Sequence, residues 1–402
     1  MKIVHLGDTH LGYAGVGVQR LVEDPFRPGV HVRQQEADLM RGLAGAVDAI
    51  IGDVRPAAVV HSGDLFDSPS PSASTLAFAM HQFHRLSKEG IPVLIVEGDH
   101  SCPRSRSHGH ILTMLNYLPG VTAVGGEPAG HCVGGVAFHA VPHRAALLNA
   151  PFGTGCRDPL RPNVLVTHGV ADSLGFFRTG RLAASIPVRE NAARYDYVAL
   201  GHCHRFGQVP HTYNAFYAGA TAMVTPADFR PGYEFGFNVV DLGGSVPRVE
   251  RRVVETRPMH PYGIDDAEGL SAEEILAFLG RQVAELPARD AYCRVEILGV
   301  DPRACQKLPN RTVEELFAGA AATAINMRVR EARWGAVAAD LKSAGAPEAR
   351  FLQLVASMDG EDDFKAEVRE LGLTFLRDAA ARVDMDDLEG TPGGDVGAPE
   401  TP

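Results

Sequence analysis

Aspartate and histidine recur at five points in the first half of the chain, each time directly after a short apolar run. The five sequences are Gly7-Asp8-Thr9-His10, Gly63-Asp64-Leu65-Phe66-Asp67, Gly98-Asp99-His100, Thr167-His168-Gly169 and Gly201-His202-Cys203-His204. Of the 17 histidines, 16 lie at or before position 211. Because histidine is the commonest metal ligand and a frequent acid–base residue, we expect the chemistry to lie in this half of the chain.

Three carboxylates and four imidazoles in these motifs form a candidate metal-ligand set. Its members are Asp8, His10, Asp64, Asp99, His168, His202 and His204. Oxygen and nitrogen ligands suit Mn²⁺, Fe²⁺, Zn²⁺ or Mg²⁺, and seven donors are too many for one ion. Two ions about 3.5–4 Å apart that share a carboxylate can clamp a phosphate and activate water. Each motif alone is typical of an ordinary turn, but together they favour a two-metal phosphodiesterase.

Short apolar segments must position these side chains. We predict strands at Ile3–Leu6, Ala57–Val60, Val93–Val96, Val164–Val166 and Tyr197–Leu200. Helices are predicted at Gln34–Asp53 and Ser74–Lys88, and further strands at Ala215–Ala218 and Phe237–Leu242. This alternation indicates α/β layers. Five strand ends in one sheet would gather the ligands at one edge, and the neighbouring glycines would allow tight turns.

The sequence predicts further regions after residue 252. Residues 253–335 read as a small α+β domain with strands at 253–257, Tyr292–Leu298 and Ile325–Arg330, and helices at Ala272–Glu285 and Thr312–Ala321. Ser271 is an expected helix N-cap because acids follow it in the first turn. Residues 346–388 read as two amphipathic helices split by the acidic Asp359–Asp363, and residues 389–402 as a disordered tail rich in glycine and proline.

Charge and cysteine content restrict the class of protein. The net charge is −11, but residues 359–402 hold 13 acids and only 4 bases, so the remaining chain is nearly neutral. A free-standing DNA-binding protein usually has a basic surface, so affinity for nucleic acid would need local patches, metals or a partner. The six scattered cysteines form no CxxC pair, which indicates reduced thiols. No apolar run predicts a signal peptide or a membrane span, so we expect a cytoplasmic protein without membrane attachment.

These motifs resemble those of the calcineurin-like metallophosphoesterases: D-x-H, G-D, G-N-H, a histidine followed by glycine, and G-H-x-H. The subfamily resemblance is to SbcD-type DNA repair nucleases, bacterial relatives of the nuclease subunit of the Mre–Rad complex. Segments around Asp8 and Asp64, and later Tyr217–Thr221 and Gly236–Leu242, carry it. The resemblance implies a metallophosphoesterase β-sandwich flanked by helices in residues 1–252, an α+β capping domain in 253–335, and C-terminal helices.

The same resemblance implies a role for each candidate residue. Asp8, His10 and His204 would hold the first metal, and Asp64 would bridge both metals. The second metal would be held by His168, His202 and Asp99. His100 would lie near the scissile phosphate, stabilising its charge or protonating the leaving oxygen, a role that suits the pKa of imidazole. Two divalent ions are implied; Mn²⁺ is the expected metal, with Mg²⁺, Fe²⁺ and Zn²⁺ as alternatives.

The chain departs from the family pattern at three positions. Asp99 stands where the family has asparagine. A carboxylate can bind a metal, but it lacks the amide donor and adds negative charge toward an anionic substrate. We therefore expect metal binding with reduced turnover or altered metal preference. Ser101 stands where an acid is frequent, and Asp67 stands where some archaeal relatives have histidine.

The resemblance also implies DNA as substrate and an SMC-like ATPase as partner, with a homodimer as a further alternative. Basic side chains that could contact DNA phosphates are Arg104, Arg106, His108 and His110, which follow the His100 loop, and Arg178, Arg181, Arg189 and Arg194; scattered solvated arginines are the alternative. Apolar residues of the C-terminal helices, from Phe351 to Leu376, could dock on the ATPase or pack on this chain. Three functions therefore remain: a DNA exonuclease or endonuclease, a phosphoesterase acting on a small nucleotide or phosphoprotein, and a DNA-end-binding module.

Overall fold

The computed structural model describes two units separately. The first unit is Met1–Arg330 and the second is Glu331–Pro402. The described residues are 1–15, 20–103, 109–152, 158–174, 183–230 and 232–330, together with eleven residues between 351 and 373, all of them helical. The predicted tail at 389–402 and the acidic 359–363 segment lie outside the described residues.

Two six-stranded sheets form the centre of residues 1–253. The first has the order β16 (Arg248–Val253), β15 (Gly236–Asp241), β1 (Lys2–Leu6), β4 (Ala58–His61), β5 (Val93–Val96) and β6 (Val121–Val124). The second has the order β13 (Gly207–Gln208), β14 (Ala215–Tyr217), β12 (Tyr197–Gly201), β9 (Asn163–His168), β8 (Val136–Val141) and β7 (Ala129–Val133). Within each sheet, the strands that lead into the candidate ligands run parallel to one another, whereas β1 is antiparallel to its other neighbour, β15.

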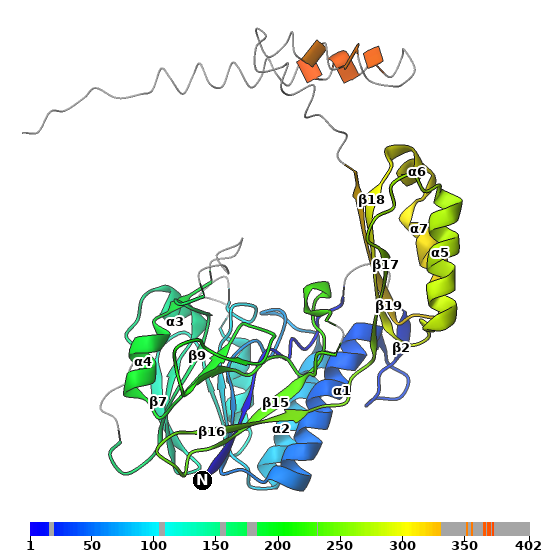
Figure 1. Ribbon diagram of the computed structural model, residues 1–402. Helices are drawn as coiled ribbons and strands as arrows, with labels where there is room; N and C mark the ends of the chain where they lie inside the picture. Colours follow the sequence, from blue (N-terminus) through cyan, green and yellow to red (C-terminus); the bar gives the residue numbers. More distant parts are fainter. Residues whose placement is uncertain are drawn as a thin grey trace, which may run out of the picture. The chain divides into compact units, whose positions relative to one another are not determined.

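Helices cover the outer face of each sheet (Figure 1). The first sheet carries α1 (Gln34–Ala49), which continues as a π turn at Ile50–Val54, and α2 (Ala73–Lys88). The second carries α3 (His143–Leu147) and α4 (Val188–Arg194). A separate apolar cluster, which includes Ile3, Val60 and Val166, fills the space between the sheets. The result is the predicted β-sandwich flanked by helices.

The burial of these strands explains why they appear in the sequence as continuous apolar runs. Every residue of β4, β5, β9 and β12 is buried, as expected for parallel strands covered on both faces. The predicted strands are confirmed, and so is the sandwich implied by the family resemblance, but the five ligand-bearing strands do not lie in one sheet. β1, β4 and β5 belong to the first sheet, whereas β9 and β12 belong to the second. Apolar runs of this kind do not reveal which sheet a strand joins.

Residues 259–329 form a smaller α+β region. Its parallel sheet has the order β17 (Met259–Ile264), β18 (Tyr292–Val300) and β19 (Ala322–Val329). Its helices are α5 (Ala272–Glu285), α6 (Pro302–Lys307) and α7 (Asn310–Leu316). Ser271 caps α5, as predicted, and the structure adds a reciprocal bond to Glu274 that completes a capping box. The predicted strand at 253–257 is wrong, because β16 ends at Val253 and the chain then crosses to β17, with Arg257 bonded to helix α1.

Smaller elements complete the first unit. They are β2 (Leu21–Glu23), β3 (His31–Arg33), β10 (Val170–Ala171), β11 (Ser185–Ile186), and the 3₁₀ helices η3 (Ile111–Tyr117) and η4 (Pro226–Asp228). The pair β2–β3 is antiparallel, and β10–β11 is parallel.

A buried histidine links the two sheets by hydrogen bonds. His5 of β1 contacts the Tyr197 hydroxyl of β12 through Nδ1, at 3.0 Å, and Ser62 Oγ through Nε2, also at 3.0 Å. Burial, together with the nearby His61 and Arg251, lowers the pKa of His5 to about 3. His5 therefore stays neutral in the folded chain, whereas the unfolded chain takes up a proton below about pH 6.5.

This difference predicts an acid dependence of stability. Below pH 6.5 the unfolded state binds a proton that folded His5 excludes, so the free energy of unfolding should fall as pH falls toward 3. In metal-free protein between pH 6.0 and 5.0, His5→Gln should reduce this slope by about 1 kcal/mol per pH unit. Urea unfolding at several pH values measures the slope. The exposed His84→Gln is the matched control; equal slopes in the two variants would contradict the prediction.

Candidate metal centre

The loops after five strands bring all seven predicted ligands together. β1 leads to Asp8 and His10, β4 to Asp64, and β5 to Asp99; β9 ends on His168, and β12 leads to His202 and His204. Overlapping groups of these residues, within 4.8 Å between donor atoms, connect the whole set. The ligands thus come from the carboxyl ends of both sheets, which meet at one edge of the sandwich.

Backbone conformation at the site is strained. Asp8, His10, Asp64 and His202 have φ angles of 51°, 44°, 51° and 98°. Non-glycine residues avoid this left-handed region, and each such residue costs roughly 1–3 kcal/mol unless its surroundings hold it. Only eight non-glycine residues of the described chain have positive φ, so half of them are candidate ligands. This concentration is typical of a functional site.

Two glycines allow the ligand loops to touch. A Cβ at Gly63 would lie 2.2 Å from His168 Nδ1, and a Cβ at Gly98 would lie 2.2 Å from Asp64 Oδ1. Neither approach is sterically feasible with a larger residue. The glycines beside the ligands therefore have a second role besides turning the chain. Gly63 lets a loop of the first sheet approach His168 of the second, and Gly98 lets the loops after β5 and β4 approach each other within the first sheet.

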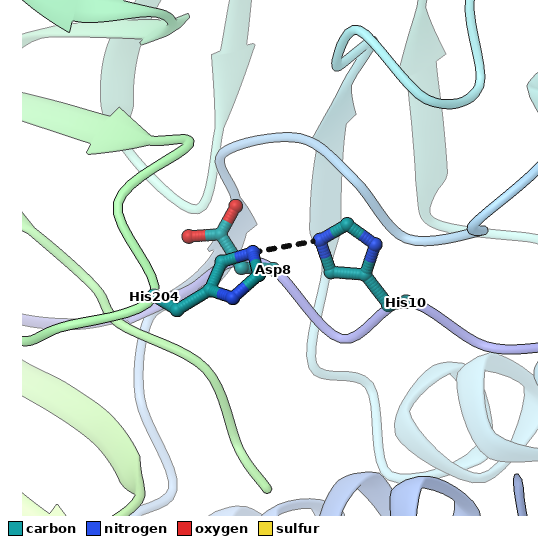
Figure 2. A group of neighbouring side chains, drawn as sticks. All are labelled: Asp8, His10 and His204. Atoms are coloured by element: carbon teal, nitrogen blue, oxygen red, sulfur yellow. Dashed lines mark hydrogen bonds between the residues drawn. The ribbon is translucent and has the colours of Figure 1, made fainter. Parts of the chain in front are cut away.

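Asp8, His10 and His204 form the first donor set (Figure 2). His10 Nδ1 lies 3.0 Å from Asp67 Oδ1, and His204 Nδ1 lies 2.8 Å from Asp228 Oδ2. Because each carboxylate accepts the Nδ1 proton, both Nε2 atoms present lone pairs in the neutral tautomers. These two Nε2 atoms lie only 3.1 Å apart.

A cation between the rings would satisfy this arrangement. Two facing lone pairs repel each other unless a proton or a metal ion lies between them. Asp8 Oδ2 is also buried without a hydrogen-bond partner among the described residues, although buried carboxylate oxygens normally have one. The donors present therefore fit a divalent metal ion.

Asp99, His168 and His202 form the second donor set. His168 Nδ1 donates to the Ser62 carbonyl oxygen at 2.9 Å, which leaves the Nε2 lone pair for a ligand. This Nε2 lies 2.9 Å from Asp99 Oδ1 and 3.2 Å from Asp64 Oδ2. Since a lone pair that faces two carboxylates needs a positive charge, this set fits a second cation by the same argument.

Asp64 lies between the two donor sets. Its Oδ2 is 3.2 Å from His168 Nε2 and 3.6 Å from His10 Nε2. Its Oδ1 accepts the backbone N–H of His100 at 3.0 Å. Asp64 is only 2% exposed. The predicted bridging residue is thus placed where one carboxylate reaches both sets.

Protonation in the metal-free chain follows the same electrostatics. Burial favours neutral imidazole, but Asp64 and Asp99 outweigh it and raise the pKa of His168 well above its usual value. Burial is likewise outweighed at His204, where Asp228, with Asp8 and Asp64, raises the pKa to about 9. Although burial opposes ionisation, the adjacent histidines lower the pKa of both Asp64 and Asp99. Each set therefore attracts positive charge, which a divalent ion would supply in place of protons.

His100 lies beside the shared carboxylate and is held by Asp67. Its Nδ1 is 3.0 Å from Asp67 Oδ1, the same oxygen that contacts His10. The rings of His10 and His100 are 4.6 Å apart between centroids. Burial lowers the pKa of His100, but Asp67, Asp64 and Asp99 together raise it above its ordinary value. His100 is therefore suited to carry a proton next to the metal centre.

Three residues near the site had no predicted role. Asp67 was noted only as a departure from the archaeal pattern, and Asp228 and His143 were not singled out. Asp228 contacts a ligand 24 positions away in sequence, so only the Thr225-Pro-Ala-Asp228 capping pattern could have drawn attention to it. His143, at the start of α3, is 4% exposed, and its ring lies 6.0 Å from that of His168.

The predicted DNA contacts are mostly not described. Arg104, Arg106, His108, Arg178 and Arg181 lie outside the described residues. His110 is described, and its ring lies 2.7 Å from buried Glu97 and accepts the Leu112 N–H at 3.1 Å. It therefore ties the start of η3 to Glu97, which follows β5. Arg189 is exposed, and Arg194 pairs with Glu190.

Several known proteins are similar to this chain in sequence. DNA double-strand break repair protein Mre11 of Haloferax volcanii is 29% identical over 401 residues, covering 96% of this chain and 76% of that protein. The protein of the same name from Methanocaldococcus jannaschii is 26% identical over 296 residues, covering 67% and 71%. That from Methanococcus maripaludis is 31% identical over 120 residues, which span 30% of this chain and 28% of its own.

Residues 1–206 match the family of calcineurin-like phosphoesterases. The matched part includes the five ligand-bearing loops, and the predicted enzyme class, a metal-dependent phosphodiesterase, is confirmed at the level of the family. The chain belongs to the calcineurin-like phosphoesterase family.

Proposed function

We propose that the protein is a metal-dependent nuclease that hydrolyses phosphodiester bonds of DNA during repair. The observation that carries this proposal is the double donor set around Asp64, with His100 held beside it. The relatives named for DNA double-strand break repair support DNA as the substrate. Asp8, His10 and His204 would hold one ion, His168, His202 and Asp99 the other, and Asp64 would bridge them.

The residues around the ions set up the reaction. When bound, two divalent ions supply Lewis acidity and an activated water. Asp67 and Asp228 hold His10 and His204 with their Nε2 atoms directed into the first set. Ser62 does the same for His168 in the second set. These fixed orientations reduce the reorganisation needed at the reacting centre.

His100 would act on the scissile phosphate. Its Nδ1 is held by Asp67, which directs Nε2 away from that carboxylate, and its pKa is raised by the surrounding acids. A protonated imidazole can stabilise negative charge on the phosphate or donate its proton to the leaving oxygen. We therefore assign His100 the catalytic role and Asp67 the role of orienting it.

An SMC-like ATPase remains the proposed partner. In the second unit, a Cβ at Gly372 would lie 2.0 Å from the Phe351 ring, and Val355 is buried. The two helical stretches therefore pack against each other and could present a common docking face. No helix among the described residues has the length and apolarity needed to cross a membrane. We also propose a cytoplasmic location. A homodimer of this chain is a further proposed assembly.

A nuclease assay tests the proposed reaction. With Mn²⁺, the wild-type chain should degrade labelled linear duplex or single-stranded DNA. His100→Ala should lose at least about 100-fold in rate, because general acid catalysis contributes roughly 10²–10⁴-fold, while binding of Mn²⁺ is retained. Digestion of small phosphodiesters alone would favour the alternative substrate class, and end binding without cleavage would favour a binding module.

Asp99 provides a second test. Its carboxylate approaches His168 and His202 at 2.9 and 3.2 Å and adds a negative charge where the family pattern has a neutral amide. Asp99→Asn should keep two bound ions and raise the cleavage rate or change the preferred metal. Metal titration and initial rates with Mn²⁺ and Mg²⁺ measure both effects. Unchanged occupancy, rate and metal preference would show that the charge has no role.

A further inference from the structure

Asp228 makes three hydrogen bonds through a single oxygen. Its Oδ2 accepts from Thr225 N at 2.7 Å, from Thr225 Oγ1 at 3.1 Å and from His204 Nδ1 at 2.8 Å. The two bonds from Thr225 fix the carboxylate within the capping box of η4. Asp228 is therefore directed at His204 by its own turn, and the orientation of His204 depends on where that turn lies.

The turn is held in place by two other parts of the chain. Helix α1 bonds it through Gln35, whose Nε2 donates to the carbonyl oxygens of Met223 and Val224. The apolar cluster beneath the turn joins α1, the segment 220–235 and the region 259–329. Its buried members are Leu39, Ala220, Ala222, Met223, Val224, Phe229, Phe235, Tyr292 and Ala321. Through Tyr292 and Ala321, the smaller α+β region therefore packs in the same apolar cluster as the segment that carries this turn.

Tyr292 is also tied to α1 by a polar contact. Its hydroxyl donates to Asp38 Oδ2 at 2.8 Å. Arg257, in the crossing between β16 and β17, donates to both oxygens of Asp38, at 2.6 and 3.0 Å. Asp38 lies one helical turn from Gln35, so the same face of α1 holds both Tyr292 and the Asp228 segment.

One side of the turn is not closely packed. A cavity of about 500 Å³ is lined by Pro226 and Ala227 of η4 and by strand residues of the smaller region, including Thr323 and Ile325. The same cavity also borders Gln35 of α1 and Tyr292, so η4 adjoins open space next to the residues that hold it. Loss of the Tyr292 support would leave room for η4 to shift.

We propose that Asp228 is the positioning residue of metal ligand His204 and that the region 259–329 keeps Asp228 in place through Tyr292. The inference rests on the proposed metal centre and deepens it. Asp228 holds Nδ1 so that Nε2 faces His10 and Asp8. The smaller region then contributes to metal affinity without supplying a ligand.

Mn²⁺ binding to the full chain tests the role of Asp228. The wild type should bind two ions in a titration followed by electron paramagnetic resonance. Asp228→Asn should weaken one of them about 10-fold, as loss of a carboxylate behind a metal-binding histidine typically does, and should leave the other unchanged. Equal affinities in wild type and variant, with the melting temperature recorded alongside, would overturn this role.

Tyr292→Phe tests the contribution of the smaller region. It removes one hydroxyl, keeps the ring in the apolar cluster, and should weaken the same ion about threefold. Tyr262→Phe is the matched control, because Tyr262 is equally buried in the same region and its hydroxyl donates to Leu286 O at 2.7 Å, away from η4. Tyr262→Phe should lower stability to a similar degree and leave both affinities unchanged.

The outcomes separate the inference from the proposed function. A wild-type chain that binds no ion would show that the metal centre itself is wrong. Two bound ions with equal affinities in Tyr292→Phe and Tyr262→Phe would overturn the contribution of the smaller region. A loss of affinity in Tyr292→Phe that simply follows its melting temperature, and appears equally in Tyr262→Phe, would also overturn it.

Discussion

The structure depends on the placement of lone pairs and carboxylates around two points that need positive charge. His10 and His204 direct Nε2 atoms at each other over 3.1 Å, and His168 Nε2 faces two carboxylates. Such groups would repel one another in a buried space without a cation. Because the surrounding acceptors fix each imidazole, the repulsion cannot be relieved by a simple change of tautomer. The fold therefore holds these imidazoles and carboxylates in positions that a divalent ion would stabilise.

Bringing the metal-ligand side chains together requires strained backbone conformations and close contacts between loops. The four candidate ligands with positive φ and the glycines that touch His168 and Asp64 show where that cost is located. Two rigid parallel strand sets with fully buried strands offset it. Their loops can hold strained conformations because the strands beneath them are buried and hydrogen-bonded to their neighbours. The buried contact between His5 and Tyr197 joins the two strand sets directly behind the site.

The sequence allowed prediction of the ligands and strands, because each ligand follows its strand within a few residues. Helix α5 and its Ser271 cap were predictable for the same reason, since the signal is local. The sandwich was expected from the family resemblance, but the apolar runs themselves did not show which strand joins which sheet, because a buried apolar run carries no information about its neighbours. The roles of Asp67 and Asp228 were missed because they depend on contacts over 57 and 24 positions. The strand expected at 253–257 failed because Arg257 pairs with Asp38 of α1.

Charge balance at the second donor set explains why Asp99 matters more than its conservative appearance suggests. With asparagine, that set would contain two imidazoles and the shared Asp64; with aspartate it carries a further negative charge. The extra charge strengthens attraction for a cation, as the raised pKa of His168 shows for a proton. It also opposes the approach of a phosphate, whose charge the same ions must attract. We therefore expect the one additional charge of Asp99 to tighten metal binding and to weaken the attraction of the substrate, so that metal retention increases while turnover decreases.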